Sequence, residues 1–548
     1  MGLLNLVKDY ISENKCIFSL YISVCCFGYF IRVIILSLLF GKLFREEVTK
    51  EKFLSIIKQI CFTWILLSII YIIWNRLNYS IVPDFLSYIR TRLIKNYIIM
   101  NEIEFNDNNI NDDVNNIFEL ARNMKDVFVW VCEILIPIFV LMIILNLYFL
   151  FNYPLIGVIN IIGNMVNLII GLTSYSKLID SANLRLDKLL HLNSKVNENF
   201  NNLFNAYINT KTDDIVSEHK KIELEYYDSF QYQMKEVESF GIKLRYNNYF
   251  FSFLTLFFLY KNFSKQDFVN ALIIYAFYLT AIENMMDNVL SIVSTIGNSI
   301  RIYDKITNNQ ELRTERTEGL KLENFKGEIN FNNISFKYPF DTTNSYIIKN
   351  FNLYIPSKSK NVIIAQSGSG KTTLMKLLLG FYTIEEGEIL LDGISINSID
   401  PISIRTHINY INQKTLLLND TIMNNIRYGN NKKDTDIIQI LNQYDLLKIF
   451  NPPLENPESC LQKVVQKDGN NISLGMQKVI YLVRGILRDA EVYVFDEPLT
   501  SIDSNTRQNI INMIKNQTEN KTLIIITHDM EITSIVDKVI DFDEINKN

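Results

Sequence analysis

The sequence predicts an α-helical membrane domain of six spans, fused to an α/β domain that carries a phosphate-binding loop. Three observations lead to this fold class. Long apolar stretches fill the first 300 residues, whereas the second half has the composition of a soluble domain. A glycine-rich loop follows an apolar strand at 365–374. A chain of 548 residues is also too long for a single hydrophobic core.

Composition limits the classes of partner. Hydrophobic residues make up 48% of the chain, and its net charge is −5, which argues against a nucleic-acid partner. None of the six cysteines forms a zinc-type CxxC pair, and five lie in or beside apolar runs. We therefore interpret the cysteines as small buried hydrophobes.

Six stretches have the roughly 20 mostly apolar residues that a membrane helix needs. They are residues 16–41, 55–75, 127–150, 153–174, 246–262 and 267–292. We expect an integral, multi-pass membrane protein in contact with lipid. The expected domains are a transmembrane domain at 1–300, a polar linker at 301–325 and the α/β domain at 326–548.

The connections between the spans predict the topology. Short turns join spans 3–4 and 5–6, whereas the 2–3 and 4–5 connections are long, charged and amphipathic, so their helices are expected to continue beyond the bilayer. Lys and Arg are plentiful in the long connections, which places them and both termini on the cytosolic side. The first span is too long for a cleavable signal peptide, and the 15 residues before it contain no Arg of an import presequence.

Few ionisable residues lie inside the predicted spans. Arg32, Glu133 and Glu283 are candidates for lining a cavity, because charged groups at membrane depth face protein or water rather than lipid. The alternative is that they make hydrogen bonds between helices or lie near the ends of spans.

The segment NVIIA-QSGSG-KTTLMKLLL has the order strand, glycine-rich turn, helix. Backbone N–H groups in this turn can surround phosphate oxygens at the positive end of the helix. Lys371 would reach the β- and γ-phosphates, and the Thr372 hydroxyl would bind Mg²⁺. Ala365 replaces the first glycine of the usual pattern, at little cost if its φ is negative and about 1 kcal/mol or more if it is not. The predicted phosphate-binding residues are Gln366, Ser367, Gly368, Ser369, Gly370, Lys371, Thr372 and Thr373.

Three further segments contain candidate catalytic or metal-binding residues. VYVFDE is an apolar strand that ends in Asp496, a predicted Mg²⁺ ligand, and Glu497, the predicted general base for the attacking water. His528 ends another apolar strand and is predicted to contact the γ-phosphate. Gln413 also follows a strand, where its amide would meet both Mg²⁺ and the water.

SGSGKTT, Gln413, DEPLTSID and THD, in this order, resemble an ATP-binding cassette (ABC) domain, and six spans ahead of them resemble an ABC exporter half-transporter. The resemblance implies ATP and Mg²⁺ as cofactors, stacking of Tyr338 on adenine, and a D-loop role for Asp503. It also implies short coupling helices in the two long connections that dock near Gln413. The stretch 412–430 is similar to mitochondrial iron–sulfur-type exporters and to lipid and multidrug exporters, with a lean toward the first group. A mitochondrion-related membrane and the plasma membrane both stay open.

The signature segment departs from the family's LSGGQ pattern. ISLGM keeps Ser473 and Gly475, which the resemblance implies would contact the γ-phosphate of the opposite subunit, but has Leu474 and Met476 at the third and fifth positions. A homodimer would use this altered signature at both sites. A heterodimer with a second half-transporter would supply a better signature.

The resemblance implies ATP-driven export by a dimer, with each ATP between the loop of one subunit and the signature of the other. The cargo, a small molecule, peptide or lipid, is not identified. The alternative is a nucleotide-gated regulator or channel with little turnover, which Leu474 and Ala365 favour and the pair Asp496–Glu497 disfavours.

Overall fold

The computed structural model describes residues 2–43, 49–102, 110–262, 265–307, 319–338, 345–366, 368–413, 416–450, 457–466 and 469–546. The chain divides into two compact units. The helical unit comprises Met1–Met100 and Asp107–Leu312, and the C-terminal unit comprises Asn101–Asn106 and Arg313–Asn548.

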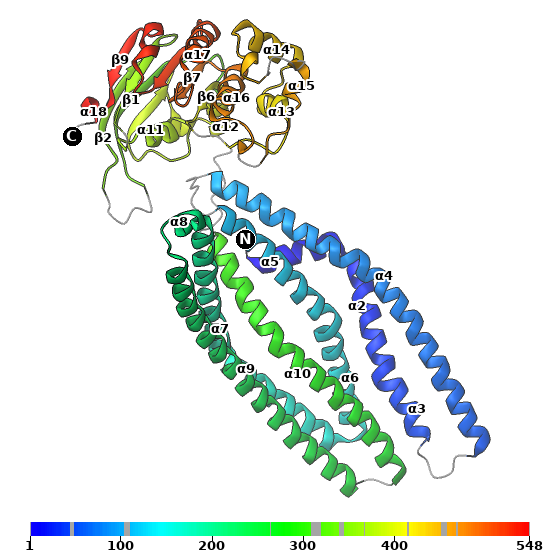
Figure 1. The fold of residues 1–548 in the computed structure, drawn as a ribbon. Coiled ribbons are helices and arrows are strands. Elements are labelled where there is room, and N and C mark those ends of the chain that lie inside the picture. Colours follow the sequence, from blue (N-terminus) through cyan, green and yellow to red (C-terminus); the bar gives the residue numbers. More distant parts are fainter. Residues whose placement is uncertain are drawn as a thin grey trace. The chain divides into compact units, whose positions relative to one another are not determined.

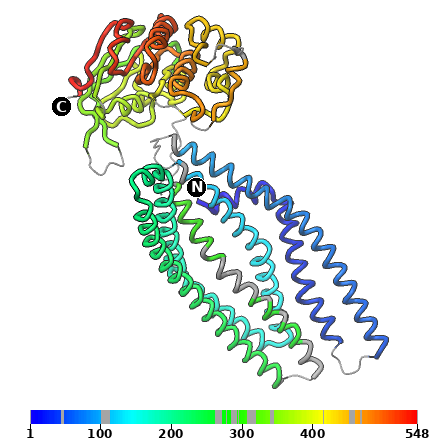
Figure 2. The backbone as a smooth tube through the Cα atoms, in the orientation of Figure 1, coloured from blue at the N-terminus to red at the C-terminus, as the bar shows by residue number. Residues whose placement is uncertain are grey.

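The helical unit consists of long helices with short interruptions (Figure 1). They are α1 (Leu3–Glu13), α2 (Lys15–Phe30), η1 (Ile31–Ile35), α3 (Leu36–Leu43), α4 (Lys50–Glu102), α5 (Ile110–Trp130), η3 (Val131–Leu135), α6 (Ile136–Asn152), α7 (Pro154–Asn201), α8 (Leu203–Ile208), α9 (Thr212–Asn262) and α10 (Lys265–Thr307). Figure 2 traces α3 and α4 as an antiparallel pair, held by contacts of Leu36 and Leu39 with Ile60.

Four helical segments within the described residues are long and apolar enough to cross a membrane: Lys15–Leu43, Lys50–Met100, Asp113–Asn152 and Pro154–Asn201. They contain the first three predicted spans and all of the fourth except its first residue, Tyr153. The other two predicted spans lie within α9 and α10, so the count of six remains a prediction from the sequence. The short apolar segment Ala271–Thr280 of α10 lies inside the sixth.

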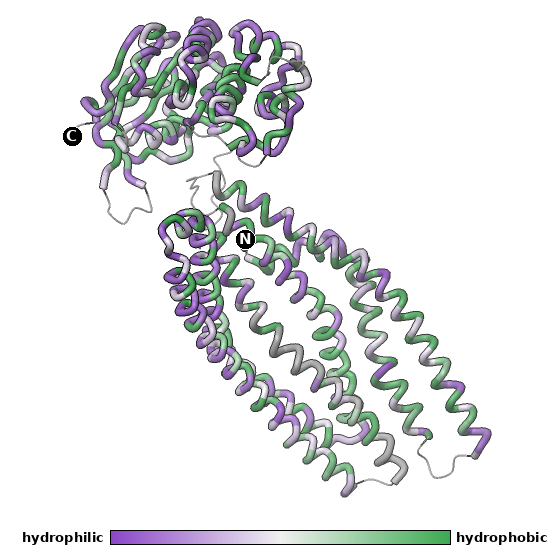
Figure 3. The backbone as a smooth tube through the Cα atoms, in the orientation of Figure 1, coloured by the Kyte–Doolittle hydropathy of each residue, from purple (hydrophilic) through white to green (hydrophobic). Residues whose placement is uncertain are grey.

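The long connections are continuous with the helices of the spans, as the sequence predicts. The 48 residues of α7 extend about 70 Å at 1.5 Å per residue, more than twice the roughly 30 Å of a bilayer core. Hydrophilic residues become frequent toward the α8 end of α7 and α9 (Figure 3). The short helix α8 joins these two helices at that end.

Amide side chains tie α7 to α9, which lie side by side (Figure 1). Asn247 donates to the carbonyl of Gly163 over 3.0 Å and to Oδ1 of Asn167 over 2.8 Å. The hydroxyl of Thr255 donates to Oδ1 of Asn160 over 3.2 Å. Inside the predicted spans 153–174 and 246–262, uncharged polar groups therefore join these two helices, whereas Lys188 and Glu225 form an ion pair between them outside the spans.

Two π-helical segments interrupt the helices of predicted spans. η1 separates α2 from α3, and η3 separates α5 from α6. A π turn adds one residue to the helical turn and opens the backbone locally. The sequence patterns do not predict either segment.

The C-terminal unit is built on two sheets. The antiparallel sheet has the order β2-β1-β4-β5, and the parallel sheet has the order β6-β7-β8-β3-β9. The strands are β1 (Ile329–Phe336), β2 (Ile348–Ile355), β3 (Lys360–Ile364), β4 (Glu386–Leu391), β5 (Ile394–Ser395), β6 (Ile408–Ile411), β7 (Val492–Asp496), β8 (Thr522–Ile526) and β9 (Lys538–Asp541). All five residues of β7 and of β8 are buried, as expected for central parallel strands covered on both faces.

Helices cover these sheets and enclose two apolar cores. The longer ones are α11 (Lys371–Leu378), α12 (Pro401–His407), α13 (Ile422–Arg427), α14 (Asp434–Gln443), α15 (Pro457–Leu461), α16 (Leu474–Leu487), α17 (Ser504–Gln517) and α18 (Phe542–Ile545); short 3₁₀ turns are η4 (Ile396–Ser398), η5 (Leu447–Ile449) and η7 (Met530–Ile535). One core joins α13–α17 to the parallel sheet, and the other joins the antiparallel sheet to α11.

Candidate nucleotide site

The parallel sheet brings the sequence motifs to one edge. The carboxyl ends of β3, β6, β7 and β8 lead into Ala365, Gln413, Glu497 and Thr527 respectively. Ligands of open parallel sheets bind beyond the carboxyl ends of the strands. Segments far apart in the sequence therefore meet where a nucleotide phosphate would bind.

The phosphate loop has the backbone that its glycines permit. Gly368 and Gly370 have φ values of 82° and 100°, in the left-handed region that favours glycine. Gly370 is the N-cap of α11, so the loop leads directly to a helix N-terminus. Ser367 lies outside the described residues.

Ala365 fits the loop without backbone strain. Its side chain is buried, with 2% of its surface exposed, and it does not have a positive φ. The methyl group therefore belongs to the core beneath α11 and leaves the glycine-rich part of the loop unchanged. From the sequence, the cost of alanine in place of glycine at position 365 depended on the sign of φ. Because φ is not positive, this cost is small.

Asp496 ends β7 in a buried position. Burial raises the pKa of its carboxyl, and the hydroxyl of Tyr410 opposes this by donating a hydrogen bond of 2.9 Å to Oδ2. Tyr410 lies on β6 opposite Val494, two residues before Asp496, so both side chains point to the same face. The sequence interpretation missed Tyr410, although the alternation of strand residues before Gln413 contains the signal.

Glu497 is held by three backbone and side-chain contacts. Oε2 accepts a hydrogen bond of 3.0 Å from the Thr527 hydroxyl, and Oε1 accepts one of 3.2 Å from the backbone N–H of His528. Its own N–H donates to the carbonyl of Ile526. The residue has a φ of 49°, a left-handed conformation that costs about 1–2 kcal/mol for a residue with a β-carbon.

Lys371 connects this carboxylate edge to the loop. Its Nζ donates to the carbonyl oxygens of Ala365 and Gln366 over 2.7 and 3.2 Å and lies 3.5 Å from Nε2 of His528. The imidazole of His528 also lies 3.9 Å from Oε1 of Glu497. The predicted phosphate and water-activating groups are thus neighbours.

The other predicted binding residues occupy different parts of the loop. Thr372 is exposed at the start of α11, whereas Thr373 is buried and shares a hydrogen bond of 3.0 Å with the hydroxyl of Tyr338. The ring of Tyr338 packs edge-on against Phe336 and Tyr382. The Tyr338 hydroxyl thus couples this aromatic group to the phosphate-loop helix.

Comparison with known proteins identifies this unit. A family model described as ABC transporter matches residues 348–500. The C-terminal unit is an ABC transporter domain.

The chain is 31% identical over 277 residues to the multidrug resistance-like ATP-binding protein MdlB of Buchnera aphidicola, a match that covers 49% of this chain and 46% of the relative. It is 34% identical over 217 residues to the mitochondrial iron-sulfur clusters transporter ATM1 of Candida albicans, with 39% and 28% covered. The chain thus spans less than half the length of these curated relatives.

A solved structure resembles the chain over nearly all its length. It is a bacterial Atm1-family ABC exporter with ATP bound, with a TM-score of 0.78 and 15% sequence identity; the match covers 98% of this chain and 94% of that chain. Similarity at this identity shows the fold alone. The predicted fold class, apolar membrane helices fused to an ABC domain, is confirmed.

The predicted signature segment begins a helix that has an intact N-cap. Ser473 is the N-cap of α16, and its hydroxyl accepts a hydrogen bond of 3.2 Å from the N–H of Met476. Leu474 is 66% exposed, so its side chain points away from the domain core. Gly475 lies near the carbonyl of Ser501, where an added β-carbon would come within 3.6 Å of the oxygen.

Asp503 and Gln413 are surface residues of the ABC domain. Asp503 caps α17 by accepting a hydrogen bond of 3.0 Å from the N–H of Thr506. The side chain of Thr506 and this N–H together lower the pKa of the Asp503 carboxyl. Gln413 is exposed, and its carbonyl accepts a 3.4 Å hydrogen bond from Nζ of Lys478.

Lys478 is a buried cation that the sequence interpretation missed. It lies on α16, only 5% exposed, and burial lowers the pKa of its ammonium to about 8, against the opposing charges of Asp496 and Glu497. Its signal is visible in the sequence, since Lys478 and Arg484 are the two charged residues of an otherwise uncharged helix.

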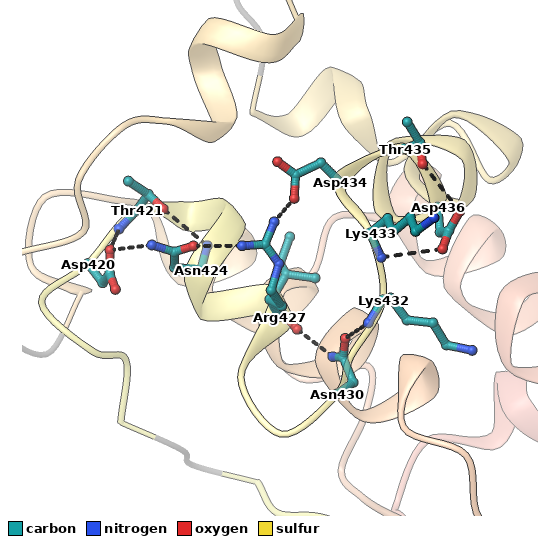
Figure 4. A network of polar contacts seen from close by, with 11 residues as sticks. Asp420, Thr421, Asn424, Arg427, Asn430, Lys432, Lys433, Asp434, Thr435 and Asp436 are labelled. Atoms are coloured by element: carbon teal, nitrogen blue, oxygen red, sulfur yellow. Dashed lines mark hydrogen bonds and ion pairs between the residues drawn. The ribbon is translucent and has the colours of Figure 1, made fainter.

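The segment that follows Gln413 is fixed by polar contacts (Figure 4). Thr421 caps α13 through the N–H of Asn424, and Arg427 contacts both Asn424 and Asp434. Arg484 of α16 donates to the carbonyl of Asn425 over 2.6 Å. These contacts link the region after Gln413 to the signature helix.

Proposed function

We propose that the chain is one half of an ATP-driven membrane exporter, and that two copies form the working transporter. The arrangement of Glu497, held by Thr527 and the N–H of His528 beside Lys371, carries this proposal. A protein that only bound nucleotide would not need an oriented carboxylate at this edge. The multidrug and iron–sulfur relatives and the exporter fold support it.

Glu497 acts as the general base. The Thr527 hydroxyl and the His528 N–H fix the direction of its two oxygens, and each oxygen keeps a lone pair for a proton of the attacking water. The exposed imidazole of His528 lies beside Lys371, where it would contact the γ-phosphate. Gln413 positions the water from the neighbouring strand end.

The loop residues fit a triphosphate. The hydroxyl Oγ of Ser369 is buried and has no hydrogen-bond partner among the described residues, although it lies in the turn that faces the helix N-terminus. Buried polar atoms are normally satisfied, so a phosphate oxygen is a suitable acceptor here. Lys371 would exchange its loop carbonyl contacts for phosphate oxygens, and the ring of Tyr338 would stack on adenine.

The donor set at the strand ends fits Mg²⁺. The Thr372 hydroxyl, the Asp496 carboxylate and the Gln413 amide are oxygen donors of the kind that this hard cation prefers. A bound Mg²⁺ would neutralise charge on the phosphates. Tyr410 supports the ion by orienting the Asp496 carboxylate.

Two copies would complete each site. Ser473 and Gly475 of one copy would contact the γ-phosphate held by the other, with Asp503 nearby. The capped start of α16 and the outward direction of Leu474 favour a homodimer, because the altered signature keeps its backbone donors. A heterodimer remains the competing arrangement. The helix α8 would dock on an ABC domain as a coupling helix, and the transported cargo is a small molecule, peptide or lipid.

Purification of the chain alone in lipid nanodiscs tests this proposal. We expect Mg²⁺-dependent ATP hydrolysis with a Hill coefficient above 1, and ATP-dependent uptake of cargo into inverted vesicles. Turnover that requires a second, different subunit would show the heterodimer. ATP binding with passive flux and no phosphate release would show a nucleotide-gated channel instead.

A further inference from the structure

Among the described residues of the helical unit, η1 and η3 each contain the one charged residue of a predicted span. Arg32 is the only charged residue in span 16–41, and it lies in η1. Glu133 is the only charged residue in span 127–150, and it lies in η3. π turns inside α-helices are frequent at functional sites. The surroundings of these two residues are therefore relevant to function.

Glu133 lies beside side chains of two other helices. Its Oε1 accepts a hydrogen bond of 2.5 Å from the hydroxyl of Tyr21 on α2, and the indole of Trp74 on α4 lies beside the carboxylate. Tyr21 is fully buried and lies 3.3 Å from Oδ1 of Asn78. Glu133 itself is only partly buried.

No cationic side chain lies within 4 Å of Glu133 in the part of the chain that the structure describes. A carboxylate at membrane depth is costly, and such residues usually have a partner of opposite charge. A contact between helices at this depth does not require a charge, because α7 and α9 are joined inside their predicted spans through Asn167, Asn247 and Thr255. An uncharged hydrogen-bond acceptor would therefore suffice for helix packing at position 133.

The predicted topology places this group near the cytosolic ends of three spans. Tyr21 follows the start of span 16–41 by five residues, Trp74 precedes the end of span 55–75 by one, and Glu133 follows the start of span 127–150 by six. At 1.5 Å per residue these positions lie within about 10 Å of the same boundary. A cargo taken up from the cytosol would reach this depth first.

We infer that Glu133 and Trp74 form a binding site for a positively charged group of the cargo, and that the buried Tyr21 orients the carboxylate. The carboxylate supplies the opposite charge, and the indole of Trp74 suits an organic cation, because ammonium and guanidinium groups bind aromatic faces. This inference rests on the proposed export function, and it names organic cations as the substrate class.

The test measures binding of ethidium, an organic cation, and fluorescein, an organic anion, to the nucleotide-free chain in lipid nanodiscs, corrected with empty nanodiscs. We expect ethidium to bind more tightly than fluorescein, and Glu133→Gln to weaken ethidium binding about tenfold or more. Glutamine keeps the size and the hydrogen-bond acceptor. Glu119→Gln, on the same helix about four turns away, is the matched control and should bind like the parent.

Equal ethidium affinity for the parent and Glu133→Gln would overturn the inference, as would a parent that binds fluorescein as tightly as ethidium. A structural role alone would lower the melting temperature of Glu133→Gln and leave its preference for ethidium over fluorescein unchanged. Because binding is measured without ATP, a chain that binds ethidium but never hydrolyses ATP would refute the export function and not the site.

Discussion

The hydroxyl of Tyr410 on β6 donates a 2.9 Å hydrogen bond to the buried carboxylate of Asp496 at the end of β7. This bond opposes the effect of burial, which raises the pKa of Asp496. Replacing Tyr410 with Phe would raise that pKa further and leave the carboxylate less well oriented. We expect the Mg²⁺ concentration for half-maximal ATPase activity to rise about tenfold, with a larger effect at pH 6 than at pH 8.

Titration of ATPase activity with Mg²⁺ at both pH values measures this. Tyr493→Phe is the control, because the Tyr493 hydroxyl also makes one 2.8 Å hydrogen bond but donates it to the carbonyl of Arg488. Equal Mg²⁺ requirements for Tyr410→Phe and the parent would show that the bond serves packing alone.

Glu497→Gln should keep ATP binding and lower turnover by roughly 10²-fold or more, the effect of losing a general base. Glutamine can still accept the hydrogen bonds from Thr527 and His528, so the geometry should survive. Phosphate release and equilibrium binding of a fluorescent ATP analogue separate the two effects. Turnover at the parental rate would remove Glu497 from the role of base.

Lys371→Ala should act in the opposite way, by weakening nucleotide binding itself. Its ammonium already makes contacts of 2.7 and 3.2 Å with loop carbonyls, within reach of bound phosphates. The same binding assay tests this, with Lys376→Ala on the same helix as the control. Unchanged ATP affinity in Lys371→Ala would contradict the assignment.

Lys478 predicts how the stability of the ABC domain depends on pH. Its pKa is about 8 in the folded chain and 10.5 when exposed, because burial disfavours the ammonium. The unfolded chain therefore binds more protons between pH 8 and 10.5, and this residue makes stability rise with pH across that window. The full difference is on the order of 3 kcal/mol.

Lys478→Met should remove that rise and stabilise the domain at pH 7. Melting curves of the parent and the variant between pH 7 and 10.5 test this, and their difference cancels the other groups that titrate. Lys448→Met is the control, since Lys448 is an exposed residue in a surface ion pair with Asp445. A constant difference between parent and Lys478→Met at all pH values would contradict the prediction.

Leu474 and Ser473 should respond differently to substitution. Ser473→Ala removes the cap of α16 and should cost about 1 kcal/mol of stability.

Leu474→Gly removes an exposed side chain that would face the nucleotide of the second copy, so we expect higher ATPase activity with a small loss of stability. Lower activity in Leu474→Gly would show that the leucine takes part in the contact between copies.

The parts of the site that depend on local order were predictable from the sequence. The order strand, glycine-rich turn, helix predicted the position of Lys371. Asp496–Glu497 and Thr527–His528 follow apolar strands, and they were predicted to meet because the carboxyl ends of parallel strands share one edge. Tyr410 and Lys478 were not predicted, since their partners come from strand register and helix packing. The cost of Ala365 depended on a backbone angle that no residue pattern reveals.

The helical unit shows the same division. Composition along the chain predicted the long helices, because apolar stretches and amphipathic connections without breaks form continuous helices. Their extension into water stays a prediction. The π turns contain Arg32 and Glu133, but a single charged residue in an apolar span does not by itself predict a π turn.

The left-handed backbone at Glu497 means that hydrolysis and folding make opposing demands on this position. Glycine or asparagine would adopt this conformation more easily than glutamate. A duplicated copy of the gene, released from selection for turnover, would therefore become more robust through the same substitution that silences it. In such a copy, substitution of Glu497 by glycine or asparagine is expected first.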